Sequence, residues 1–154
     1  MSLKEELGLD RPIDTEEHEC LLNIVYTGTL ISKLSNKFFS KSGTTDAQFN
    51  VLMQLKYSKS QELSQVALSK RLFVNRADVT GLIDRLEKAD MVKRTAHPED
   101  RRVNIISITG KGMELLDKLE PLYFKEVNRV LARLNQSDIK QVINSMEKIR
   151  MNLK

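Results

Sequence analysis

Cysteine, proline, glycine and tryptophan are scarce in this chain of 154 residues, which has one Cys, three Pro, six Gly and no Trp. A single cysteine excludes an internal disulfide framework and favours a reducing, cytoplasmic location. The few proline and glycine residues exclude long loop-rich stretches. No apolar run is long enough for a membrane span, and the charged start lacks a signal-peptide core. The apolar residues are mainly Leu, Ile, Val and Met, which suits one compact domain of packed helices.

Positive charge is concentrated in the middle of the chain. The net charge is +4, and residues 69–111 contain ten basic and six acidic residues, so this segment alone accounts for it. The remaining 15 basic and 15 acidic residues cancel. Such a segment is expected where a chain meets a polyanion, although charge alone supports a solvated surface equally well.

The helical spacing of apolar residues, together with cap residues at the helix starts, predicts that most of the chain is helical. Thr45 and Gln48 have the pattern of a capping box, and Ser64 is a plausible N-cap whose helix turns Val66 inward. Pro121 lies inside a long helix and is expected to kink it. The predicted helices span approximately residues 15–40, 45–55, 64–72, 76–89, 111–134 and 137–153.

Between residues 91 and 108 the spacing changes from helical to that of a β-hairpin. Residues 91–94 predict a short strand, a turn containing His97 and Pro98 follows, and the β-branched residues 103–108 predict the returning strand. Two short helices joined by a tight turn and followed by a hairpin make a winged helix-turn-helix. We therefore predict a mainly α fold with a two-stranded β-wing and long N- and C-terminal dimerisation helices.

This arrangement predicts DNA binding through the second helix of the pair and the wing. The major groove admits one helix, whose first residues reach base edges: Arg pairs with guanine, Asn with adenine, and Asp accepts from cytosine. A wing guanidinium suits a narrow minor groove, and we expect the second wing arginine to pair with Asp100 or another acidic residue and so hold the hairpin. The candidate DNA-binding residues are Ser64, Asn75, Arg76, Ala77, Asp78, Thr80, Arg101 and Arg102.

The central segments, residues 79–88, 92–94, 98–102 and 106–112, resemble the MarR family of bacterial and archaeal regulators. The most specific feature of the resemblance is Asp100-Arg101-Arg102 in the wing, followed by Ser107-Ile108-Thr109 at the end of the returning strand. The resemblance implies a sequence-specific transcriptional regulator, a ligand-responsive repressor that binds double-stranded DNA at a palindromic operator as a homodimer. It also implies a small aromatic or phenolic effector in a cleft between the first helix, the helix after Thr45 and the helix after Gly112.

The resemblance divides the chain into three intertwined parts. Residues 1–42 are expected to form an N-terminal dimerisation helix, residues 43–110 the winged helix-turn-helix, and residues 111–154 the C-terminal dimerisation helices. The dimer seam should include Ile139, Val142, Ile143 and Met146. Gly81 departs from the family pattern, because relatives often carry a basic residue there.

Two alternative functions remain open: a winged-helix protein–protein adaptor that does not bind DNA, and a cysteine-based redox-sensing regulator. The acidic neighbours Glu16, Glu17 and Glu19 favour a protonated thiol, so Cys20 is expected to be a small buried or half-buried hydrophobe. No metal site, cofactor, catalytic residue or membrane partner is predicted. The two histidines lie in separate elements, and phosphate-loop, nucleophile-elbow and paired-cysteine motifs are absent.

Overall fold

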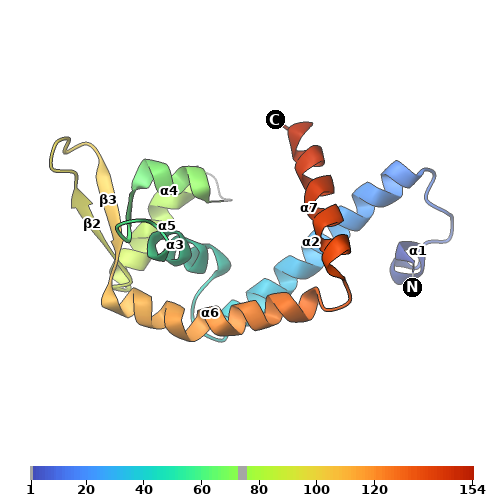
Figure 1. Ribbon diagram of the computed structural model, residues 1–154, viewed down its shortest axis with the longest axis horizontal. Coiled ribbons are helices and arrows are strands. Elements are labelled where there is room, and N and C mark those ends of the chain that lie inside the picture. Colours follow the sequence, from blue (N-terminus) through green and yellow to red (C-terminus); the bar gives the residue numbers. More distant parts are fainter. Residues whose placement is uncertain (1, 73–75) are drawn as a thin grey trace.

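The computed structural model describes residues 2–72 and 76–154, which form a mainly helical chain with a small antiparallel sheet (Figure 1). The helix pair α4–α5 and the β2–β3 hairpin after it confirm the predicted winged helix-turn-helix. The predicted turn before α5 and its cap Asn75 lie outside the described residues. The elements are α1 Leu3–Leu7, α2 Glu16–Ser40, α3 Asp46–Lys56, β1 Glu62–Ser64, α4 Gln65–Arg71, α5 Arg76–Lys88, β2 Val92–Ala96, β3 Asn104–Ile108, α6 Gly110–Val130 and α7 Gln136–Met151.

Local capping chemistry sets several helix starts as predicted. At α3 the Thr45 hydroxyl accepts from the backbone N–H of Gln48, and the Gln48 side chain accepts from the backbone N–H of Thr45, which completes the capping box. Ser64 caps α4. The predicted start of the last helix at Ser137 is wrong, because Asn135 is the N-cap and its side-chain oxygen accepts from two backbone N–H groups.

The sheet has three strands among the described residues, in the order β1-β3-β2, so the predicted two-stranded wing is confirmed and one further strand, β1, was not predicted. The hairpin strands β2 and β3 pair antiparallel, with Val92 opposite Ile108. The added strand, β1, pairs with the other edge of β3 and places Leu63 opposite Ile106. A segment this short and polar carries no strand pattern of its own, and pairing with β3 makes it a strand.

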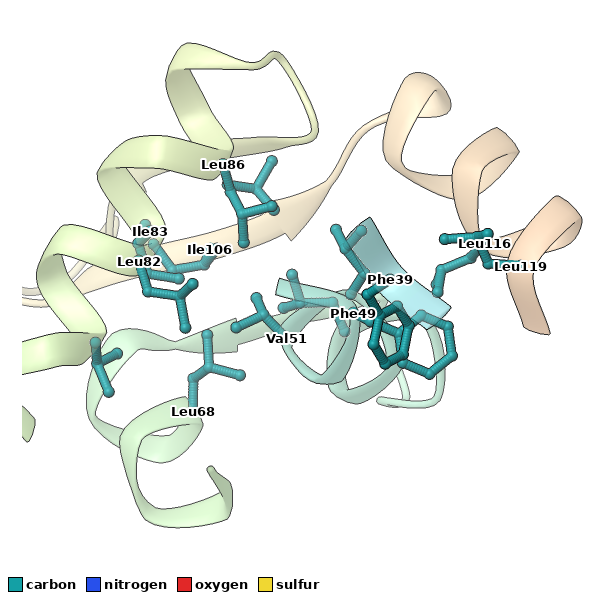
Figure 2. Close-up of a cluster of buried hydrophobic side chains, with 14 residues drawn as sticks. Phe39, Phe49, Val51, Leu68, Leu82, Ile83, Leu86, Ile106, Leu116 and Leu119 are labelled. Carbon is teal, nitrogen blue, oxygen red and sulfur yellow. The ribbon is translucent and has the colours of Figure 1, made fainter. Parts of the chain in front are cut away.

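A single apolar core joins the sheet to the helices around it (Figure 2). It includes the whole predicted inner face of α5, namely Val79, Leu82, Ile83 and Leu86. Leu52 and Leu55 of α3 and Leu68 of α4 are fully buried in the same core. Val66, predicted to face inward, is 59% exposed, because in the short helix α4 Leu68 takes the buried position. We call residues 44–119 the winged region.

The long helix α6 begins in tight contact with the winged region. Thr109 caps it and donates its hydroxyl to the Asp90 carbonyl at 2.7 Å. A Cβ on Gly112 would lie 2.3 Å from the Met91 carbonyl oxygen, so only glycine allows this approach. The helix continues through Pro121 and ends at Val130, short of the predicted end near residue 134. The predicted kink stays a prediction.

Helices α1, α2 and α7, with the part of α6 that follows Leu119, form the rest of the chain, which we call the helical arms. They lie at the opposite end of α6 from the sheet (Figure 1). In α2, which is described throughout, Phe39 is the sole buried residue, and no residue of α7 is buried. Along residues 2–72 and 76–154, no helix is both long and apolar enough to cross a membrane.

Candidate nucleic-acid interface

Helix α5 presents a polar face opposite its buried one. Of the predicted DNA-binding residues, Arg76 and Ala77 begin this helix, and Asp78 and Thr80 are exposed on it. Asn75 lies outside the described residues. The exposed positions of the helix give it donors and acceptors of the kind that read base edges.

The start of α4 lies against α5. The Gln65 side-chain amide donates to the Thr80 hydroxyl at 3.0 Å, and the preceding residue, Ser64, accepts from the backbone N–H of Ala67 at 3.1 Å. The fold therefore brings Ser64 and Thr80 to one surface across the helix pair. Sequence reasoning missed Gln65, because a contact between residues 15 positions apart leaves no periodic signal.

The wing tip is held by its own hydrogen bonds and exposes both arginines. The His97 N–H donates to the Val103 carbonyl at 2.8 Å, which closes the hairpin. Arg101 and Arg102 are exposed beside this closure. The predicted side-chain pair with Asp100 is wrong: that carboxylate accepts from the backbone N–H of Arg102 at 3.0 Å. In the described part of the chain neither wing guanidinium forms an ion pair.

Arg94 ties the wing to α5. Its guanidinium, on β2, forms an ion pair with Asp84 and lies 3.5 Å from a carboxylate oxygen of Glu87. The pair offsets the negative charge of Asp84 on the face that would approach phosphates. Arg85 folds back along the helix, its Nη1 atom 3.6 Å from where a Cβ on Gly81 would lie. The sequence offered no signal for the Arg94 pair, because its partners lie on another element.

A cavity of about 440 Å³ lies away from the wing, between α2, α3 and α6. These are the three helices that the sequence predicted around a cleft. Its lining is mostly apolar and aromatic, with two carboxylates: Ile31, Ser32, Leu34, Ser35, Phe38, Phe39, Asp46, Asn50, Tyr123, Glu126, Val127, Val130 and Leu131. Such a lining suits an aromatic compound of modest size.

Cys20 lies in the first turns of α2 and is exposed, so the expectation of a buried or half-buried side chain is wrong for this chain. The N-terminal end of α2 extends beyond the winged region (Figure 1). Among residues 2–72 and 76–154, no three His, Cys, Asp or Glu side chains are grouped as metal ligands would be.

Comparison with known proteins identifies the family. A model of the MarR family matches residues 44–103. The transcriptional repressor YetL of Bacillus subtilis (strain 168) is 31% identical over 126 residues, which are 82% of this chain and 74% of YetL. The chain belongs to the MarR family. It is a DNA-binding transcriptional regulator, as the sequence predicted.

Solved structures share the fold of this MarR-family chain. Sco3205 from Streptomyces coelicolor, solved in complex with DNA, superposes with a TM-score of 0.83 at 24% identity, over 94% of this chain and 93% of Sco3205. BpsR from Bordetella bronchiseptica, whose DNA binding is regulated by 6-hydroxynicotinic acid, superposes with a TM-score of 0.68 at 22% identity, over 83% of this chain and 98% of BpsR. At these identities the likeness establishes the fold alone.

Proposed function

We propose that this MarR-family regulator is a homodimeric repressor that binds a palindromic operator and releases it when a small aromatic or phenolic compound binds. The observation that carries the proposal is the separation of two surfaces along the chain (Figure 1). The polar face of α5 and the wing tip lie on the winged region, whereas most of the exposed large apolar side chains lie on the helical arms. The first surface suits DNA, and the second suits another copy of the chain.

The DNA-reading part of the proposal assigns a groove to each element. The first residues of α5, from Asn75 to Thr80, enter the major groove, and Arg76 pairs with a guanine. Arg101 or Arg102 enters the adjacent minor groove. Ser64, at the start of α4, donates its hydroxyl to a phosphate.

The dimer part of the proposal accounts for apolar surface that the chain leaves open. The exposed large apolar residues of the three long helices are Leu21, Val25, Leu30, Ile31, Leu122, Phe124, Val130, Val142, Ile143 and Met151. A second copy related by a twofold axis covers such a surface with the same surface. Ile139, Val142, Ile143 and Met146 lie in the proposed seam. Residues 1–42 and 111–154 then serve dimerisation, and residues 43–110 serve DNA binding.

The effector part of the proposal uses the cavity between α2, α3 and α6. Aromatic side chains such as Phe38 and Tyr123 offer faces for an aromatic ring, and Asn50 and Ser35 offer hydrogen bonds to a hydroxyl. The cavity lies between the winged region and the arms, so its occupant is placed to change their relative position. The expected cytoplasmic location and the absence of an enzymatic role stay predictions.

The decisive experiment selects bound duplexes from a random pool with the purified full chain, with and without candidate aromatic compounds. We expect enrichment of one palindrome, affinity that falls steeply with salt, and release by at least one compound. Arg76→Ala should cost about 1–3 kcal/mol and change base preference. Replacing the groove-reaching wing arginine should lower the salt slope by about one unit. A protein adaptor would show neither enrichment nor salt dependence.

The exposed thiol of Cys20 makes the redox alternative testable. We propose that Cys20 is not a switch, because the chain has no second cysteine that could resolve an oxidised thiol. Cys20→Ser should leave operator binding, with and without peroxide, the same as in the wild type. Release of the wild type by stoichiometric peroxide, with the Ser variant still bound, would assign the chain to a hydroperoxide-sensing function instead.

A further inference from the structure

A cluster of polar side chains outside the surfaces above joins α3 to α6. The ammonium of Lys56, in the last turn of α3, lies 2.7 Å from Oε2 of Glu120 and 2.9 Å from Oδ1 of Asp117. The neighbouring Tyr57 donates its hydroxyl to the other carboxylate oxygen of Glu120. The Glu120 side chain is 12% exposed, so this ion pair is largely shielded from water. We call Lys56, Tyr57, Asp117 and Glu120 the α3–α6 clamp.

The clamp holds the turn of α6 that proline weakens. Pro121 directly follows Glu120 and has no N–H to donate to the carbonyl of Asp117, four residues earlier. The turn from Asp117 to Pro121 therefore lacks one backbone hydrogen bond. Asp117 and Glu120 belong to this same turn. Their ion pairs with Lys56 therefore stabilise α6 at the place where a backbone hydrogen bond is missing.

This turn separates two parts of α6 with different surroundings. Before it, Leu116 and Leu119 are buried in the core of the winged region. After it, Leu122 and Phe124 are exposed, and the helix leads to α7. The orientation of the winged region relative to the arms therefore depends on the geometry around Glu120, together with the packing of Phe39 and Tyr123 against Phe49 of α3.

We propose that Lys56, Tyr57 and Glu120 are positioning residues that set the angle between the winged region and the arms, and through it the spacing of the two α5 helices in the dimer. This inference rests on the proposed homodimer with two DNA half-sites. Hydrogen bonds from Lys56 and Tyr57 hold the pKa of the Glu120 carboxyl below its ordinary value. The carboxyl of Glu120 is therefore ionised at neutral pH, as its ion pair with Lys56 requires.

The DNA test compares Lys56→Met with Arg129→Met in the full chain. Each variant removes one positive charge. Lys56→Met also removes two ion pairs between α3 and α6, whereas Arg129→Met removes a single pair, with Glu126, that lies within α6 and joins no second element. The probes are the duplex selected by the wild type and versions with one or two base pairs inserted between the half-sites. We expect Lys56→Met to reduce discrimination against the insertions by about fivefold or more, with an unchanged salt slope. Arg129→Met should discriminate as the wild type does.

Two further variants separate positioning from general destabilisation. Lys56→Arg keeps the cation and should retain most of the discrimination. Glu120→Gln keeps the side-chain shape and should lose it, and it replaces Lys56→Met if that variant does not fold. Equal discrimination by the wild type and a folded Lys56→Met or Glu120→Gln variant would overturn the proposal, even if their stability were lower.

A DNA-independent measurement distinguishes failure of this inference from failure of the proposed function. Spin labels at Lys88→Cys on α5 and Lys148→Cys on α7, in a Cys20→Ser background diluted with unlabelled chain, report the distance between winged region and arm within one chain. We expect one narrow distance distribution with the clamp intact or with Arg129→Met, and a broad or shifted distribution with Lys56→Met. Identical distributions would refute the clamp, whereas a wild type that selects no duplex would refute the proposed function alone.

Discussion

The winged region and the helical arms differ in how much of their own surface they cover. In the winged region, α3, α5 and β3 contribute fully buried side chains to one core, among them Ile83 and Ile106 (Figure 2). Leu52 of α3 is fully buried as well. In the arms, no residue of α7 is buried, although this helix has apolar residues at regular helical spacing. The winged region supplies nearly all of the core, to which α2 adds Phe39, whereas the arms leave most of their large apolar side chains exposed. Stability should therefore be intrinsic to the first and dependent on concentration in the second.

The largest expected effect comes from opening a cavity in the winged region. Leu52→Ala should lower the free energy of unfolding by about 2–5 kcal/mol, because the side chain is fully buried and the lost methyl groups leave a void. Val66→Ala, at an exposed site of the same region, should change it by about 0.5 kcal/mol or less. Urea titration at two protein concentrations measures both. A loss for Leu52→Ala that depended on concentration would contradict a self-contained core.

The arms should respond to a charge in the proposed seam. Ile143 is 50% exposed on α7, and Ile143→Asp should weaken dimer formation by about 2 kcal/mol or more, because the carboxylate would be buried against the partner. The matched control, Asn144→Asp, adds the same charge one position along α7, away from the Ile139–Met146 stripe. Sedimentation velocity distinguishes the species. A wild type that is already a well-folded monomer at micromolar concentration would contradict the proposed dimer seam.

A side chain at Gly112, where α6 meets the sheet, should lower the stability of the chain. Gly112→Ala should destabilise the chain by about 1–3 kcal/mol, because its Cβ would overlap the Met91 carbonyl and force α6 away from the sheet. Gly110→Ala, two residues earlier, meets nothing within 4 Å and should be neutral or slightly stabilising. Thermal unfolding of both variants provides the measurement. Equal melting temperatures would show that the start of α6 can shift without loss.

The smallest effect is the pH dependence of the clamp. The pKa of Glu120 in the folded chain lies below its ordinary value of 4.5, first because of the hydrogen bond from Lys56 and then that from Tyr57. Stability from this carboxylate is therefore present above that ordinary value and is lost as the pH falls through the lower, folded-state pKa. We expect Glu120→Gln to remove about 1 kcal/mol of acid-dependent stability. Urea midpoints for both proteins across the acid range should converge at the lowest pH, and parallel curves would contradict the assignment.

The contacts between distant elements of the site could not be predicted from the sequence. Thr80 was assigned to base reading, and its hydroxyl accepts from Gln65 on the neighbouring helix. A wing arginine was expected to pair with Asp100 or another acidic residue, whereas the ion pairs between the wing and α5 are formed by Arg94. Lys56 and Glu120 lie 64 residues apart, so neither charge alone indicated a partner. Each of these pairs depends on how two elements pack, and a single sequence carries no periodic trace of that.

Local chemistry was enough to predict most elements. The capping box at Thr45, the N-cap at Ser64 and the buried face of α5 follow from hydrogen bonds and spacing within a few residues, and the structure confirms all three. The tertiary structure alone decided that residues 62–64 form a strand, that Val66 faces solvent, and that α6 starts against Met91. Each of these outcomes is set by a neighbour supplied by the rest of the chain, namely β3, the better-placed Leu68 and the segment between α5 and β2.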